Sequence, residues 1–486
     1  MTDAVVIGSG PNGLAAAVAL AQAGAKVLVL EAHEQIGGGT RTAELTLPGF
    51  KHDVCSAVHP MGPLSPYLRT LPLEAHGLRW KRGTASVAHP LDEGPAALLT
   101  RSVDETAAQF SPASERAYRR LVAPFLGEMD ALLADALAPL KIPRHPFLMA
   151  RFGLLAIRSA QSLVRRFDDP RARALFVGCA GHAILPMDFA LTGALGLMFL
   201  LTGHADDWPV AEGGSHAITQ ALASLLVSLG GRIETNTRVT SFAQLPEARA
   251  YLFDTDPFQL ASIAEAQLPT GYVQRLRKYR FGPAAFKVDW ALSGPVPWRD
   301  PACLRATTLH LGGTFEEIAA SEAAMWRGEH SEKPYILYAQ QSAVDSTRAP
   351  AGCHTGWAYC HVPANSTKDM TAIIEAQVER FAPGFGERIL ARHVSSPQFF
   401  ADYNSNDVGG AITGGVADLG QLFTRPVARL NPYTTPNPRI FICSGSTPPG
   451  GGVHGMCGYF AAQAALKHAL RKSIGGKRPL ALPPPP

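Results

Sequence analysis

Charged residues are sparse in this sequence, and the patterns that mark nucleic-acid-binding proteins are missing. Asp, Glu, Lys and Arg make up 17% of the 486 residues, against 46% hydrophobic residues, and the formal net charge is +4. No basic run with interleaved aromatic residues occurs, so we expect no nucleic-acid partner. The length and the hydrophobic content predict a globular protein of two domains with a large interior.

The cysteines lack the spacings of redox and metal sites. None of the seven cysteines belongs to a C-x-x-C pair or a metal-ligand pattern. We therefore expect reduced thiols, no metal and no disulfide chemistry. The first apolar strand begins at Ala4, so we also expect no cleavable signal peptide and a cytoplasmic protein.

No apolar run is long enough to cross a membrane. The most apolar stretch, 189–201, has 13 residues, whereas a spanning helix needs about 20. A helix expected from Phe147 to Gln161 combines apolar residues with arginines. This composition suits a helix on a membrane surface or one that covers an apolar cavity, so peripheral membrane contact stays open. The tail 473–486 is expected to be loose.

A glycine motif follows the first expected strand. Ala4–Ile7 reads as a buried parallel strand, and Gly8-x-Gly10-x-x-Gly13 leads into a small-residue helix. Gly8 permits the tight turn, Gly10 lets the backbone approach a pyrophosphate, and Gly13 lets the helix pack closely. The start of that helix offers N–H groups and a positive dipole end to phosphates, so Pro11 and Asn12 join the expected site.

An acidic residue and a second glycine turn indicate which dinucleotide binds. Glu31 ends the second expected strand, 18 residues after Gly13, close to the roughly 20 expected for a carboxylate that binds a ribose hydroxyl. An acid at this position argues against NADP. The following residues extend the site and are typical of large FAD proteins, in which an arginine approaches the pyrophosphate: Ala32, Gly38, Gly39, Thr40 and Arg41.

The C-terminal region predicts a second contact with the same cofactor. A strand from Arg439 enters the glycine turn 449–458, which opens a helix from Tyr459 to Leu470. A glycine turn at a helix N-terminus can hold an anion or a carbonyl group. The expected contacts are Ser446, Gly452, Val453 and Gly455, and Val239, on a strand expected at 238–242, is expected to meet the adenine.

The pattern of expected strands and helices along the rest of the sequence divides the chain into domains. We expect an FAD-binding domain in three parts (1–74, 205–262 and 409–472), a helical cap at 75–204 and a substrate-domain sheet at 263–408. Within these, 102–137 reads as a helix, Ser215 as a helix cap, and 286–292 as a strand with one buried face. The expected fold is α/β, with a Rossmann-like domain of the glutathione-reductase and amine-oxidase type, an α+β substrate domain and a helical cap.

With both glycine sites in view, the chain resembles the phytoene-dehydrogenase-like family of FAD oxidoreductases, in the branch of pyridine nucleotide-disulphide oxidoreductase domain-containing proteins. The resemblance covers nearly the whole chain and rests on motifs such as VVIGSGPNGL, EAHEQIGGGTRT, FKVDWALSGPVPW and GSTPPGGGVHGMCGY. It implies an FAD-binding domain and a substrate domain, and it leaves the substrate open. The acid that often follows the last strand in related flavoproteins is replaced here by Ser444-Gly445-Ser446.

These observations predict a flavin-dependent dehydrogenation or desaturation of an apolar, isoprenoid-like or carotenoid-like molecule. Oxygen or a quinone would reoxidise the flavin, and the oligomeric state stays open. The candidate proton-transfer residues are His454 and His59, with Tyr359, His361 and Tyr433 in reserve. Two alternatives remain: an amine-oxidase-like enzyme that binds a polar substrate through Arg348, and a non-catalytic protein that escorts prenylated partners or serves as a scaffold.

Overall fold

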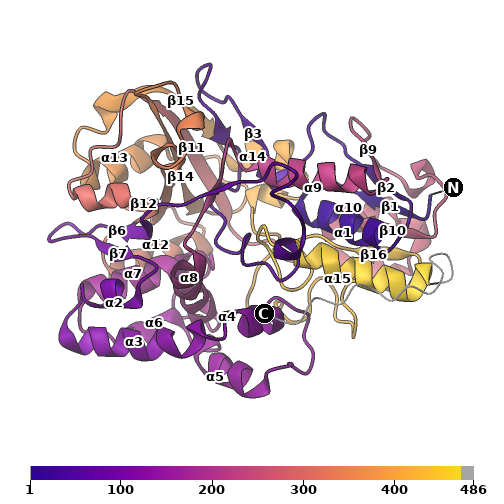
Figure 1. Cartoon of the computed structure of the whole chain (residues 1–486), viewed down its shortest axis with the longest axis horizontal. Helices are drawn as coiled ribbons and strands as arrows, with labels where there is room; N and C mark the ends of the chain where they lie inside the picture. The colour runs from indigo at the N-terminus through magenta and orange to yellow at the C-terminus, as the bar shows by residue number, and fades with distance from the viewer. Residues whose placement is uncertain (1, 472–486) are drawn as a thin grey trace.

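The computed structural model describes residues 2–471 and places them around two β-sheets (Figure 1). The expected tail at 473–486 lies outside the described residues. The five-stranded sheet has the order β16-β10-β1-β2-β9, and every neighbouring pair is parallel. The α/β fold class is therefore confirmed. Its strands are β1 (Ala4–Ile7), β2 (Val27–Leu30), β9 (Arg232–Glu234), β10 (Ala250–Phe253) and β16 (Ile440–Ile442).

Helices cover both faces of the parallel sheet. Alternate strand residues, such as Val6 and Leu252, pack against α1 (Pro11–Gln22), α9 (His216–Ser228) and α15 (Met456–Ala465). The intervening residues, such as Val5 and Phe253, pack against α10 (Pro257–Ile263) and α11 (Thr270–Leu276). Two covered faces explain why these strands read as continuous apolar runs.

The second sheet is mixed and has the order β15-β11-β14-β13-β12-β6-β7. Its pairs are antiparallel except β12 with β6. Helices α12 (Phe315–Trp326) and α13 (Thr371–Phe381) pack against it. Its strands are β6 (Ala85–His89), β7 (Ala97–Leu99), β11 (Ala284–Leu292), β12 (Ala306–Leu311), β13 (Ile336–Ala339), β14 (His354–Val362) and β15 (Ile389–Ser395).

The expectation of one buried face for 286–292 is wrong, because every residue of β11 is buried. This strand lies between β14 and β15 in the sheet. Its apolar residues, such as Trp290, pack toward α13, while Lys287 and Asp289 point to the other side and form a buried ion pair. A central strand can therefore alternate in polarity while both of its faces are covered.

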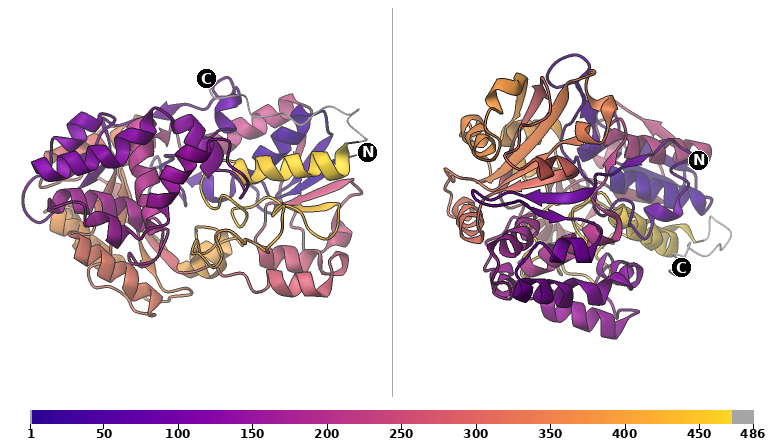
Figure 2. Two further views of the ribbon diagram at one scale, coloured as in Figure 1. Left: turned by 90° about the horizontal axis from the view of Figure 1, so that it is seen from below. Right: turned by 60° about the vertical axis from the view of Figure 1, so that its left-hand side comes forward.

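The region between the strands β7 and β8 (Val210–Ala211) is helical and gathers on one side of the molecule (Figure 2). The helical character expected for 102–137 is confirmed, and the structure divides the stretch into three helices. Ser111 caps the second of them by accepting from the Ser114 N–H, and Pro112 occupies its first position. The helices are α2 (Val103–Ala107), α3 (Pro112–Leu126), α4 (Met129–Ala136), α5 (Pro146–Ala156), α6 (Ala160–Val164), α7 (Pro170–Gly181) and α8 (Thr192–Asp206).

Two further expectations fail for local reasons. No strand forms at 238–242, because the Gln244 side chain accepts from the N–H groups of Thr240 and Ser241 and opens a short 3₁₀ turn. Ser215 does not cap α9 through its side chain, since its hydroxyl contacts His59 instead. Across residues 2–471, no helix combines the length and the apolar character that crossing a membrane requires.

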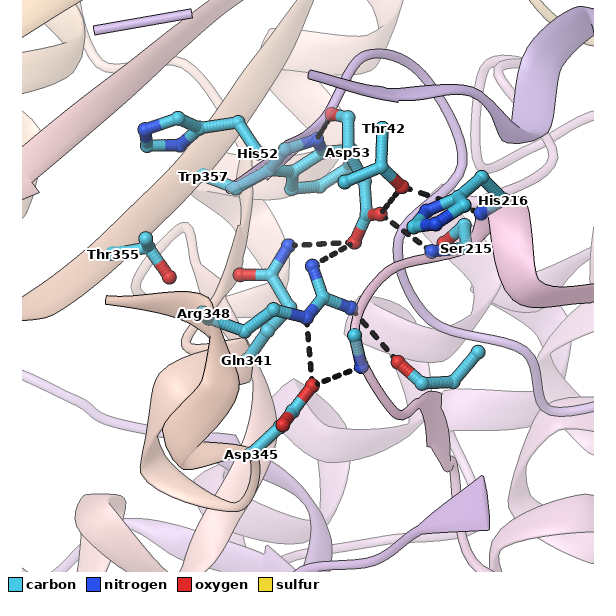
Figure 3. A network of polar contacts seen from close by, with 12 residues as sticks. Thr42, His52, Asp53, Ser215, His216, Gln341, Asp345, Arg348, Thr355 and Trp357 are labelled. Atoms are coloured by element: carbon cyan, nitrogen blue, oxygen red, sulfur yellow. Dashed lines mark hydrogen bonds and ion pairs between the residues drawn. The ribbon is translucent and has the colours of Figure 1, made fainter. Parts of the chain in front are cut away.

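A buried polar network joins the glycine-loop region to the mixed sheet (Figure 3). The Arg348 Nη1 atom lies 2.9 Å from Asp53 Oδ2, and its Nε atom lies 2.8 Å from Asp345 Oδ2. Its Nη2 atom donates to the Ala211 carbonyl at 3.0 Å. Each terminal group of the arginine is thus engaged within the protein. Asp53 follows His52 in the short strand β4 (His52–Asp53), which pairs with β3 (Thr42–Ala43).

Candidate functional site

One cavity of about 1030 Å³ extends from the first glycine loop to the helical region. Segments from both sheets and from the C-terminal turn line it, so residues more than 400 positions apart in sequence share one wall. Of the residues proposed for the cofactor, all but Gly13 and Gly455 line this cavity. Those lining it are Gly8, Gly10, Pro11, Asn12, Glu31, Ala32, Gly38, Gly39, Thr40, Arg41, Val239, Ser446, Gly452 and Val453.

The first glycine loop has the close approaches that its sequence predicts. Gly8 has a φ of +102°, which favours glycine, and a Cβ atom on Gly13 would overlap the Gly8 carbonyl oxygen. A Cβ atom on Gly10 would lie 2.6 Å from Asp254 Oδ2. The N-terminus of α1 therefore meets the cavity through backbone atoms. This arrangement suits an anionic group.

Asp254 is a residue of this site that sequence reasoning missed. It follows β10 directly, lines the cavity and accepts a hydrogen bond from the Gly13 N–H at 2.9 Å. Burial raises the pKa of Asp254 to about 8, and the nearby Glu31 carboxylate adds to that rise. A carboxyl group that keeps its proton near neutral pH can lie beside a phosphate without charge repulsion.

Glu31 is held by several donors at once. Its Oε2 atom accepts from the Ser9 N–H at 2.9 Å, and its Oε1 atom accepts from the His33 N–H at 2.9 Å. Arg41 Nη2 lies 3.1 Å from Oε1, and Arg41 Nε donates to the Gln35 carbonyl. Arg41 therefore fixes the carboxylate of Glu31 at the cavity wall.

The C-terminal turn packs onto the first glycine loop. Gly450, Gly452 and Gly455 all have positive φ values, so the turn needs glycine at these positions. α15 starts after Gly455, and a Cβ atom on Gly458 would overlap the Asn12 carbonyl oxygen. The close approach of α15 to α1 joins the two ends of the chain at one site.

The two histidines proposed for proton transfer both line the cavity. His454 Nδ1 accepts from the Met456 N–H at 3.1 Å, and burial lowers the pKa of His454 to about 4 despite hydrogen bonds to the Gly450 and Gly451 backbone. His59 Nε2 lies 2.9 Å from Ser215 Oγ, and burial lowers the pKa of His59 to about 4. Both rings are therefore neutral at neutral pH.

The other sequence-based candidates separate into two groups. Tyr359 lines the cavity. His361, bound to Glu322 at 2.8 Å, and Tyr433, which donates to the Pro448 carbonyl at 3.0 Å, lie outside the lining. The proposed substrate role of Arg348 is wrong, because the side chain is buried in the network of Figure 3 and does not reach the cavity.

His182 is a second lining residue that the sequence did not reveal. Its Nε2 atom lies 3.0 Å from His310 Nε2, and its ring packs edge-on against Phe199 and Trp208. Burial, with a contribution from His361, lowers the pKa of His182 to about 3. The His310 contact leaves Nδ1 as the ring nitrogen available to a molecule in the cavity. No motif surrounds His182, so only the folded chain identifies it.

Apolar side chains dominate the end of the cavity away from the glycine loops. They come from α5, α8 and the mixed sheet. Among them are Met149, Phe152, Leu195, Met198, Phe199 and Leu337. Within residues 2–471, no group of three His, Cys, Asp or Glu side chains could hold a metal ion. The site thus combines backbone donors at one end with an apolar enclosure at the other.

Comparisons with known proteins give full-length relatives. The chain is 28% identical to pyridine nucleotide-disulfide oxidoreductase domain-containing protein 2 of Mus musculus, across 96% of this chain and 93% of that protein. It is 25% identical to the lycopene-forming phytoene desaturase of Pseudescherichia vulneris, across 96% of this chain and 99% of the relative. The crystal structure of an oxidoreductase from Methanosarcina mazei matches with a TM-score of 0.65 at 16% identity, across 96% of this chain and 100% of that one, and so shares the fold.

The family comparison covers α1, the strands β2, β9 and β10 of the parallel sheet, and the helical region. The sequence model described as "Flavin containing amine oxidoreductase" matches residues 12–258, just over half of the chain. Together with the full-length relatives, this match confirms the resemblance that the glycine motifs indicated. On this evidence the chain belongs to the flavin-containing amine oxidoreductase family and is a flavin-dependent oxidoreductase.

Proposed function

We propose that the protein binds FAD in this cavity and dehydrogenates or desaturates an apolar small molecule. The observation that carries the proposal is the continuity of the cavity, which joins the glycine loops to a long apolar enclosure. The name of the relative from Pseudescherichia vulneris, a lycopene-forming phytoene desaturase, supports an isoprenoid-like or carotenoid-like substrate.

The residues present fit FAD. The small glycines and the α1 N-terminus suit the pyrophosphate, and Glu31 suits a ribose hydroxyl. We place the adenine near Ala32 and Val239 and the rest of the cofactor along the second glycine turn. The residues there are Gly38, Gly39, Thr40, Ser446, Gly452 and Val453. Arg41, paired with Glu31, orients that carboxylate, while Gly13 and Gly455 act by allowing close packing.

When bound, the flavin supplies a hydride acceptor for a substrate carbon. The chain must then hold the substrate, exclude water and accept the one proton that leaves the neighbouring carbon as the double bond forms. The apolar walls from α5 and α8 serve the first two tasks. For the third we favour His182 over His454, because His454 Nδ1 already accepts from the Met456 N–H. His59 is the second candidate, since its Nε2 atom contacts Ser215 and its buried Nδ1 atom has no partner. His182 lines the cavity and is neutral at neutral pH, and its Nδ1 atom can accept a proton when Nε2 donates to His310.

The alternatives fit the site less well. An amine-oxidase-like reaction that binds its substrate through Arg348 does not fit, because Arg348 is held by Asp53 and does not reach the cavity. An escort or scaffold protein without flavin would not need Gly8, Gly10 or the carboxylate of Glu31 at the wall. Oxygen or a quinone remains our proposal for the electron acceptor.

The visible absorption spectrum of the purified protein tests the proposal. We expect the bands of oxidised flavin, release of FAD on heating, and anaerobic bleaching when a suitable apolar substrate is added. A colourless protein that does not bind added FAD would overturn the proposal. A yellow protein bleached only by amines would replace the apolar substrate with the amine-oxidase alternative.

A further inference from the structure

The segment 136–167, which contains α5, combines exposed apolar and basic side chains. Six basic residues occur in it and no acidic ones: Lys141, Arg144, Arg151, Arg158, Arg165 and Arg166. All six are exposed. Arg151 lies over the Phe125 ring, and Arg158 donates to the Ser162 hydroxyl, so neither contact neutralises a charge. We call this segment the basic apolar face.

Large hydrophobic side chains on this face are exposed to an unusual degree. Ile142 is 92% exposed, Phe147 is 91% exposed and Leu154 is 74% exposed. Phe147 and Leu154 are seven residues apart on α5, which places them on the same side of the helix. Single exposed hydrophobic residues are common, but a cluster of this kind marks a contact surface.

The basic apolar face lies at the rim of the cavity. Leu140 and Ile157 are exposed and also line the cavity, and Met149 and Phe152 line it from the inner side of α5. Figure 1 shows α5 at the lower edge of the molecule, away from both sheets. A molecule that enters past α5 therefore meets apolar side chains first outside the cavity and then inside it.

We propose that the basic apolar face docks on an anionic lipid surface, with Phe147 and Leu154 inserted and the cavity rim facing the lipid. The proposal rests on the proposed function in one respect, since an apolar substrate would enter from the bilayer. Basic residues attract anionic headgroups, and apolar residues on the same helix enter the acyl boundary. The described helices are too short or too polar to span the bilayer, so docking would be peripheral.

Charge favours lipid over a second copy of the chain. A symmetric dimer places the same patch of both subunits face to face. The basic apolar face would then bring two sets of six basic residues together, with no acidic residue in the segment to offset them. Like charges across an interface oppose association, whereas an anionic membrane neutralises them.

The test is cosedimentation of the full-length protein with vesicles, either of phosphatidylcholine alone or of phosphatidylcholine mixed with phosphatidylglycerol. We expect binding to the mixed vesicles that weakens as salt rises. Phe147→Asp with Leu154→Asp should weaken binding by about tenfold or more, because aspartate is strongly disfavoured in the apolar layer. Arg151→Glu with Arg158→Glu should weaken binding only to the anionic vesicles.

The matched control is Leu390→Asp, since Leu390 is 51% exposed on β15, at the opposite edge of the molecule from α5 (Figure 1). It should bind vesicles as the unchanged protein does. Near-ultraviolet circular dichroism checks that every variant is folded. Equal binding of all variants, or no binding by the unchanged protein, would overturn the proposal. So would a drop in molecular mass on Phe147→Asp in the absence of lipid, since a second copy would then cover the face.

The flavin spectrum separates this proposal from the proposed function. A colourless protein that still binds anionic vesicles through Phe147 and Leu154 would refute the flavin chemistry and leave the docking intact. A yellow protein that does not bind vesicles would refute the docking and leave the proposed flavin chemistry intact.

Discussion

Replacing Asp254 with asparagine should remove a large pH dependence of folding stability. The buried carboxyl group has a pKa near 8 in the folded chain, against 3.8 for the ordinary side chain. The folded state thus binds the proton more tightly than the unfolded state. The Asp254 contribution to stability is complete below about pH 4 and is lost as pH rises toward 8. Asparagine resembles the protonated carboxyl group, can still accept from the Gly13 N–H, and does not titrate.

The size of the effect follows from the pKa difference. One pKa unit corresponds to about 1.4 kcal/mol, so raising the pH from 5 to 8 should cost the aspartate protein about 4 kcal/mol that the asparagine variant keeps. Urea unfolding of the cofactor-free proteins at several pH values measures this difference. Other groups titrate in both proteins and cancel in the comparison. If the free energies of unfolding of the two proteins change with pH in the same way, Asp254 is not protonated in the folded chain near neutral pH.

A second variant separates the charge from the hydrogen bond. Asp254→Ala also lacks the titrating group, so its stability relative to the unchanged protein should rise with pH with the same slope. It leaves the Gly13 N–H without its acceptor, so it should be less stable than the asparagine variant by about 1–3 kcal/mol at every pH. Affinity for added FAD should fall above about pH 8 for the unchanged protein and stay level for Asp254→Asn, because an ionised carboxylate would repel the pyrophosphate.

Three further changes probe the rest of the site. Gly10→Val should abolish flavin binding, since its side chain would occupy the space beside Asp254 Oδ2, and a variant that purifies fully yellow would contradict this placement. Arg348→Met should cost about 3–5 kcal/mol in urea unfolding, because two carboxylates lose their buried partner. Its flavin spectrum with added FAD should not change. His182→Ala should slow anaerobic flavin reduction by substrate by about 10²- to 10⁴-fold without altering the spectrum, and an unchanged rate would remove His182 as the proton acceptor.

The cofactor end of the cavity could be predicted from sequence because it is local. A strand, a glycine loop and a helix N-terminus follow one another within 4–22, and Glu31 directly follows the next strand. The backbone requires glycine at Gly8 and Gly13, so the loop can be recognised in the sequence as a glycine motif. The second turn at 449–458 is also recognisable by its glycines, and residues of this turn line the same cavity in the structure. The domain boundaries inferred from the sequence remain a prediction.

The groups that sequence reasoning missed depend on contacts between distant segments. Asp254 could be seen to follow a strand, but its place beside Gly13 requires β10 to lie next to β1, which the order of elements does not reveal. The position of His182 in the cavity wall depends on Phe199, Trp208 and His310 of the mixed sheet. In the sequence, Arg348 looked available to a substrate, because nothing there indicates its two acidic partners. Only the fold brings Asp53 and Asp345 to its guanidinium group.

The two ends of the cavity should therefore tolerate substitution differently. At the glycine-loop end, positive-φ glycines form the wall, and a side chain added at Gly10 or Gly458 meets neighbouring atoms. At the end proposed for the substrate, Met149 and Met198 present flexible side chains from α5 and α8. Changes on α5 and α8 can thus reshape the enclosure while flavin binding persists. If the proposed function holds, the substrate can change through these two helices while the glycine loops stay the same, so substrate screening should include variants of α5 and α8.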